Sequence, residues 1–185
     1  MVDRSAELLK STPEVRSPTL EPEKRQNDED FMKRIELVKV DLLELKKLVE
    51  NVESSHQRYV QAVNSDFKEK YREALSTAIH TISELIVKVT RVLKEMDGEL
   101  KGLEIKNLTN DNHYRLRLTQ QGLTTQQFQE IVKKYNQIQI SYKEKYELQI
   151  EKQYKIVNPA ATKEEIQSVI KSGRAIFSVF IIYLV

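Results

Sequence analysis

Three histidines, His56, His80 and His113, are the side chains best suited to bind a metal or move a proton near neutral pH. They lie far apart along the chain, and none has a second ligand three or four residues away in an obvious zinc pattern. The chain has no cysteine, which excludes disulfides, Cys-ligated zinc and thiol catalysis. It also lacks a Gly-rich phosphate loop. The sequence therefore predicts no enzyme, no cofactor and no metal site.

The remaining chemistry-bearing side chains follow helical spacing. His56 falls on an apolar stripe, which indicates a buried histidine with its hydrogen bonds satisfied. Tyr135 and Tyr142 lie on a second stripe, where core packing with a wet hydroxyl is the simpler alternative to an aromatic binding strip. The sequence does not decide whether Tyr146 and Tyr154 belong to the core or to such a binding strip. Carboxylates alternate with lysines, as on solvated helix faces.

Long helices must position all of these residues. Only 4 Gly and 4 Pro occur, charged residues make up 31% of the chain, and there is no Trp. Apolar residues recur three and four apart in three segments, which predicts amphipathic helices at about 28–62, 66–105 and 112–157. We expect an all-α fold, an antiparallel up-down-up three-helix bundle. The expected stripes are Phe31, Ile35, Val38, Leu42, Leu45, Val49, Val52, His56 and Tyr59; Phe67, Tyr71, Leu75, Ala78, Ile82, Leu85, Val89, Val92 and Met96; and Phe128, Ile131, Tyr135, Ile138 and Tyr142.

The two ends of the chain differ from this body. Residues 1–27 contain Pro13, Pro18 and Pro22 among polar residues, which predicts a disordered tail. Residues 158–185 are predicted to form a linker that contains a short helix at about 163–172 and has an apolar end. In that helix Thr162 and Glu165 have the spacing of a capping box.

Net charge argues against nucleic acid as a partner, because the chain carries only +2. The charge is uneven: residues 1–30 hold 5 Lys/Arg against 8 Asp/Glu, and residues 106–185 hold 12 against 7. The basic third helix could meet an acidic partner, or it could be a solvated face. No signal peptide is present, and the apolar C-terminal residues reach about half the roughly 20 that a spanning helix needs. These features favour a cytoplasmic location.

Several motifs resemble those of the syntaxin family. The third predicted helix carries Tyr135-Asn136, YKEK at 142–145 and IEKQ at 150–153, which resemble the third helix of the syntaxin N-terminal domain. EEIQSVIKSG at 164–173 resembles the linker that follows it. At the other end, Asp3-Arg4-Ser5 with Leu8 resembles the syntaxin N-peptide, although Ser5 stands where Thr is usual.

The resemblance implies a target-membrane SNARE of vesicle docking and fusion. Its N-peptide and three-helix domain would bind a Sec/Munc-family regulator, and the domain would fold back on the SNARE helix in the full-length protein. It would implicate Asp3, Arg4, Ser5 and Leu8 in regulator binding. The closed-state linker would contain Ile166, Gln167 and Ile170.

The same resemblance sets limits on partners and location. The chain stops before the SNARE motif and the membrane anchor, so we expect cognate SNARE proteins as partners only in a full-length form. Membrane contact would come only through that absent anchor, and the full-length protein would lie at the cytosolic face of the plasma membrane. The residues also permit an alternative, a structural three-helix module of spectrin-like or membrane-surface type.

Overall fold

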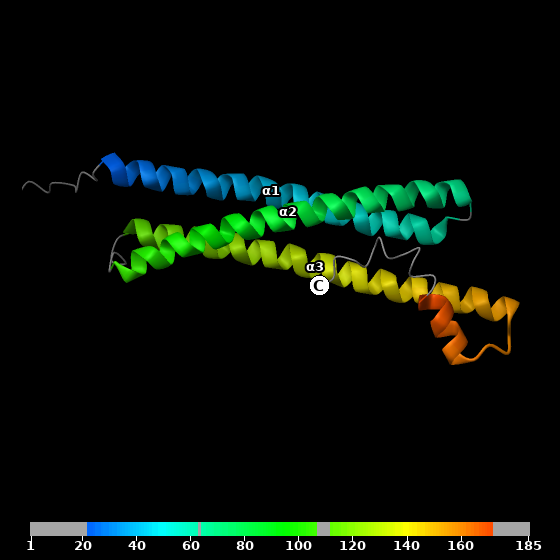
Figure 1. Cartoon of the computed structure of the whole chain (residues 1–185). Coiled ribbons are helices and arrows are strands. Elements are labelled where there is room, and N and C mark those ends of the chain that lie inside the picture. Colours follow the sequence, from blue (N-terminus) through cyan, green and yellow to red (C-terminus); the bar gives the residue numbers. More distant parts are fainter. Residues whose placement is uncertain (1–21, 63, 107–111, 172–185) are drawn as a thin grey trace, which may run out of the picture.

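The computed structural model describes residues 22–62, 64–106 and 112–171, and in residues 22–25 it describes the backbone alone. Three long helices make up most of this part of the chain: α1 (Pro22–Gln61), α2 (Ser65–Ile105) and α3 (Asn112–Val157) (Figure 1). A short helix (163–171) follows α3. No strand occurs in the described ranges. The predicted all-α three-helix bundle is confirmed.

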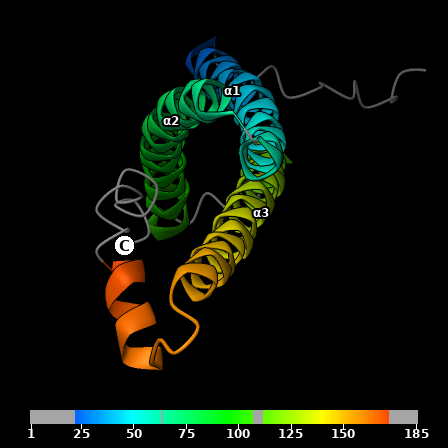
Figure 2. The same cartoon turned by 90° about the vertical axis from the view of Figure 1, so that its right-hand side faces the viewer.

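Contacts between helices establish the up-down-up order. Arg34 of α1 pairs with Glu99 of α2, and Asp41 pairs with Lys88, so α1 and α2 are antiparallel. Asp28 pairs with Arg117 near one end of the bundle and His56 bonds to Tyr146 near the other, so α1 and α3 run parallel. Viewed along its length, the bundle has α1 between α2 and α3 (Figure 2), and α2 and α3 contact each other least.

The core follows the predicted stripes closely. All eight residues of the first stripe from Phe31 to His56 are buried, and so are most of those on α2. On α3, Tyr135, Ile138 and Tyr142 are buried, while Phe128 and Ile131 are half-buried. The largest apolar cluster joins all three helices: Leu45, Val49 and Val52; Leu75, Ile79, Ile82 and Leu85; Tyr135, Ile138, Tyr142 and Tyr146.

Two sequence predictions are wrong in detail. Phe67, expected in the core, is 56% exposed. It lies in the first turn of α2, next to the end of α1, where few residues of α1 remain to cover its ring. The first helix begins at Pro22, so residues 22–27 are helical and not part of a disordered tail. Proline is well suited to a first helical turn, where its missing N–H has no intrahelical partner. Residues 1–21 and 172–185, with the predicted apolar end, lie outside the described residues.

The buried stripe of α2 is wider than predicted. Besides the expected residues, Ile79, Leu93 and Leu100 are buried. A straight α-helix has 3.6 residues per turn, so a stripe spaced at 3.5 drifts around it and neighbouring positions enter the interface. A helix that must cover more than one neighbour also buries a broader face.

A charged group is buried where α1 and α3 begin. Arg117 of α3 is buried, donates from Nε to Asp28 of α1 at 2.6 Å, and pairs with the same carboxylate through its terminal nitrogen. Its guanidinium carbon lies 5.2 Å from the ring centroid of Phe31, in cation–π geometry. The pair therefore fixes the register of α1 against α3.

We expect Arg117→Ala to lower the free energy of unfolding by about 2–4 kcal/mol, because it leaves the part-buried carboxylate of Asp28 without its main partner. Urea denaturation followed by circular dichroism measures the change. Arg115→Ala, at an exposed position two residues away, is the matched control. Equal stabilities for the two variants would show that the pair does not hold the helices together.

Candidate functional site

The site residues predicted near the N-terminus, Asp3, Arg4, Ser5 and Leu8, lie outside the described residues, so their role stays a prediction. The predicted linker residues are described. Ile166 of the short helix is buried, with 5% of its surface exposed, and Ile170 is half-buried. Gln167 is exposed. Two of the three predicted linker residues thus bury surface against the bundle.

A capping box begins the short helix, as predicted. The Glu165 amide donates to Thr162 Oγ1 at 3.2 Å, and the Thr162 amide donates to Glu165 Oε2 at 3.0 Å. These two reciprocal bonds satisfy amides that an isolated helix end leaves open. The cap holds the start of the helix so that Ile166, one residue further, reaches the bundle.

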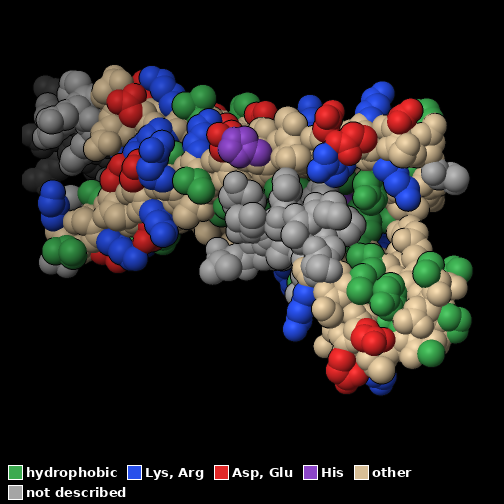
Figure 3. Space-filling view, turned by 45° about the vertical axis from the view of Figure 1, so that its right-hand side comes forward, with side chains coloured by type: hydrophobic (Ala, Val, Ile, Leu, Met, Phe, Trp, Pro, Cys, Tyr) green, Lys and Arg blue, Asp and Glu red, His purple; other side chains and the backbone are tan. Residues whose placement is uncertain are grey.

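The short helix lies beside the last turns of α3, which extend past the other two long helices (Figure 1). A groove of about 560 Å³ separates them. Its α3 side is formed by Glu144, Glu147, Leu148 and Glu151, and its other side by Lys163, Ile166, Gln167, Ile170 and Lys171. Hydrophobic side chains gather over this end of the molecule, at the lower right of Figure 3. We call this region the linker groove.

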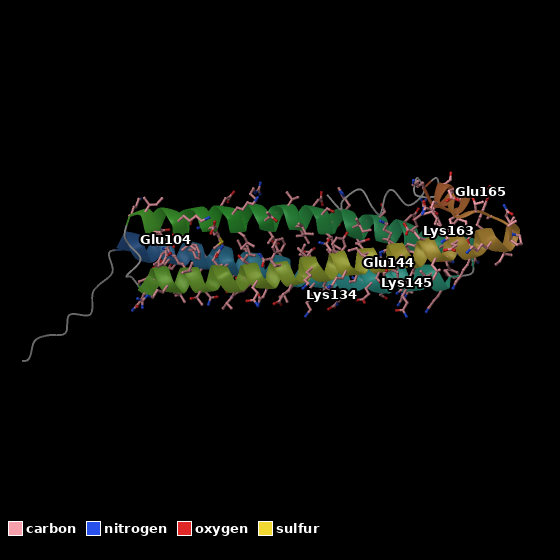
Figure 4. All side chains as sticks on the ribbon, turned by 90° about the horizontal axis from the view of Figure 1, so that it is seen from below. Glu104, Lys134, Glu144, Lys145, Lys163 and Glu165 are labelled. Carbon is pink, nitrogen blue, oxygen red and sulfur yellow. The ribbon has the colours of Figure 1, made fainter. Side chains whose placement is uncertain are left out.

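Opposite charges line the two sides of the linker groove. Three carboxylates come from α3 and two ammonium groups from the short helix, and Figure 4 labels Glu144, Lys163 and Glu165 in this region. Lys155, bonded to Glu151 at 2.6 Å, lowers the pKa of that carboxyl, and Lys163 acts in the same direction from across the groove. Charge and burial therefore both favour the docked position of the short helix.

A histidine–tyrosine cluster lies inside the bundle, next to the linker groove along α3. His56 is 1% exposed, its Nδ1 lies 2.7 Å from the hydroxyl oxygen of Tyr146, and its ring stacks on Tyr142 with centroids 4.5 Å apart. Tyr59 meets the edge of Tyr146. The predicted burial of His56 is confirmed, and one of its two ring nitrogens, Nδ1, has the expected hydrogen bond. The sequence did not assign Tyr146, although its place four residues after Tyr142 continues the stripe.

Burial controls the ionisation of this cluster. It lowers the pKa of His56 to about 4, with a smaller contribution from the charge of Lys145. It also raises the pKa of Tyr146. Both groups are therefore neutral near pH 7, and they share one hydrogen bond whose donor depends on the imidazole tautomer. A neutral pair packed in the core serves structure and is not placed for catalysis.

The described residues contain no group of three or more His, Cys, Asp or Glu side chains that could hold a metal ion. Comparison with known proteins identifies the family: the family model described as Syntaxin matches residues 25–181. The chain belongs to the syntaxin family. Syntaxins are SNARE proteins, so the prediction that the chain is not an enzyme is confirmed.

Individual relatives agree with this assignment. Protein SSO1 of Saccharomyces cerevisiae is 25% identical over 150 residues, which are 80% of this chain and 48% of the relative. Syntaxin-4 of Mus musculus is 26% identical over 154 residues, covering 80% and 49%. The chain thus spans about half the length of the curated relatives it matches.

A solved structure has the same fold. One chain of the Unc18–syntaxin 1 complex from Monosiga brevicollis superposes with a TM-score of 0.70. The match covers 82% of this chain and 70% of that one, at 24% identity. Among the described residues, no helix combines the length and the apolar character needed to cross a membrane.

We expect Ile166→Ala to release the short helix from α3, because Ile166 is its one buried residue in the described structure. Amide exchange in 163–171 should speed up about 10–100-fold while the exchange of α1 and α2 stays unchanged. Hydrogen–deuterium exchange with mass spectrometry measures this. Gln167→Ala is the exposed neighbour that serves as control. Equal exchange rates in the two variants would contradict docking through Ile166.

We expect the fold to lose up to about 3 kcal/mol of stability between pH 6.5 and pH 4 through His56 alone. In that window the unfolded chain binds a proton at His56 that the folded chain does not, so stability falls as the pH falls. Urea titrations of wild type and His56→Gln across this range measure the difference. His80→Gln, at an exposed position, should keep the wild-type pH dependence. A His56→Gln curve parallel to wild type would show that this histidine is not held neutral.

Proposed function

We propose that this chain is the regulatory, protein-binding region of a target-membrane SNARE that acts in vesicle docking and fusion. The observation that carries the proposal is the syntaxin family match, which extends from α1 through the short helix. In the full-length protein the bundle folds back on the SNARE helix and gives a closed, inhibited form. Its partner is a regulator of the Sec/Munc family. The syntaxin-type structure with the same fold comes from a complex with Unc18, which supports this class of partner.

Two parts of the chain would bind the regulator. Asp3, Arg4, Ser5 and Leu8 form the N-peptide, in which Arg4 meets acidic groups and Leu8 fills an apolar pocket. The helical bundle provides the second contact. A short peptide buries little area, so one charge and one apolar anchor should carry most of its binding energy. Joining both contacts in one chain raises the affinity through effective concentration.

The linker groove supports the closed form. Ile166 and Ile170 dock the short helix on α3, and Lys171, the last described residue, lines the same groove beside the bundle. Gln167 stays exposed, where a regulator can reach it. By this proposal the full-length protein works at the cytosolic face of the plasma membrane. Cognate SNARE proteins bind only when the SNARE helix is present and released. Family membership favours this function over a spectrin-like or membrane-surface module.

We expect Leu8→Ala to weaken binding of the chain to a Sec/Munc-family regulator by about 1–3 kcal/mol, the usual loss for an anchor residue. Isothermal titration calorimetry with the full chain measures the change. Leu9→Ala, the adjacent leucine, is the matched control and should bind like wild type. If Leu8→Ala leaves affinity unchanged, the N-peptide assignment is wrong, and if Leu9→Ala causes the larger loss, its register is wrong.

A further inference from the structure

A second groove lies between α1 and α3, and its lining shares no residue with the linker groove. Its volume is about 520 Å³. Leu42 and Val49 of α1 are buried, Ile131 of α3 is half-buried, and together they line it with apolar surface. We call it the α1–α3 groove. The residues lining it are Lys39, Leu42, Leu43, Lys46, Val49, Gln127, Glu130, Ile131 and Lys134.

The rim of the α1–α3 groove carries apolar surface that the bundle does not use. Leu43 is 62% exposed although its neighbour Leu42 is buried. Val40, three residues earlier, is also exposed and continues this surface onto the outer side of α1. A single exposed leucine is ordinary, but an exposed apolar pair beside a groove with an apolar floor is typical of a contact surface.

More lysines than carboxylates line the groove. Lys39, Lys46 and Lys134 line it, against the single carboxylate of Glu130. Lys39 bonds to Glu36 of its own helix, and Lys134 reaches Glu53 at 3.6 Å. Lys46 forms no ion pair within the part of the chain that the structure describes. The groove thus combines an apolar floor with a basic rim, and its natural complement is both apolar and acidic.

The shape of the groove narrows the choice of occupant. Its lining on α1 runs from residue 39 to 49, which is about 15 Å at 1.5 Å per residue. That length matches roughly three turns of a helix lying along the two parallel helices. The groove is open along its length, so it does not enclose a small molecule as ligand pockets do. A lipid surface prefers a continuous basic face, whereas two of the three lysines here, Lys39 and Lys134, already pair with carboxylates of the bundle.

We propose that the α1–α3 groove binds an acidic amphipathic helix of a partner protein. Apolar side chains of that helix, at spacings of three and four, contact Leu42, Leu43 and Ile131. Its flanking carboxylates pair with Lys46 and Lys134. Lys134 lies in the middle of α3 (Figure 4) and its side chain is 51% exposed, so a partner carboxylate can compete with Glu53 for its ammonium group. This inference is independent of regulator binding through the N-peptide, because it involves different residues.

The test uses the full chain and a fluorescent synthetic peptide of roughly 18 residues, long enough to form a helix. The peptide carries leucines at helical spacings of three and four with glutamates beside them, and a second peptide carries lysines in place of the glutamates. Fluorescence anisotropy gives the affinities, and amide chemical shifts locate the contact. The variants are Lys46→Glu, Lys134→Glu and Leu43→Ser, and Lys94→Glu on α2 is the matched control.

We expect the acidic peptide to bind, to shift the amides of residues 39–49 and 127–134, and to bind more weakly as salt rises. Each groove variant should lower its affinity at least about 10-fold, while Lys94→Glu leaves it unchanged. Circular dichroism checks that the variants remain folded. Three results would each overturn the proposal: no binding up to about 1 mM, equal binding of the basic peptide, or shifts confined to another face. Binding to phosphatidylserine vesicles in place of the peptide would assign the groove to lipid and overturn it too.

Discussion

The bundle depends on one constraint: the apolar stripe of α1 has to be covered by two helices at once. Phe31, Val49 and Val52 on this stripe are almost completely buried, and α1 packs against both α2 and α3. Each fully buried apolar side chain contributes about 1.5–3 kcal/mol, so removing either neighbour of α1 would cost the bundle much of its stability. α2 and α3 contact each other less, so α1 is the helix that joins the bundle together.

Polar contacts select one register among those that the stripes allow. A stripe of leucines and valines alone would let one helix shift against its neighbour by seven residues, because each heptad presents similar apolar side chains. The Asp28–Arg117 pair at one end and the His56–Tyr146 bond at the other fit only one alignment of α1 with α3. Arg34 with Glu99 does the same for α2. These contacts place Lys134 of α3 beside Glu53 of α1.

Periodicity predicts the helices well, because burial of a stripe such as Leu75, Ile82 and Val89 repeats along the chain. It cannot reveal partners that are distant in sequence. Arg117 looks like a surface residue until Asp28, 89 positions away, is brought beside it. Phe67 has the right spacing for the core, but its cover depends on where another helix ends. The cap at Thr162 could be predicted from the sequence, because its partner Glu165 is three residues away. The surface of α3 that buries Ile166 could be identified only from the structure.

The distance between the short helix and α3, measured with and without a regulator, shows directly whether the short helix stays folded back on the bundle. The chain has no cysteine, so Lys152→Cys and Ser168→Cys, at exposed positions, can carry two selective spin labels. Electron paramagnetic resonance then gives the distribution of distances between α3 and the short helix. We predict one short distance in the free chain, and we expect a Sec/Munc-family regulator to leave the distribution unchanged or to narrow it. A broad distribution of long distances, or a lengthening when the regulator binds, would contradict it.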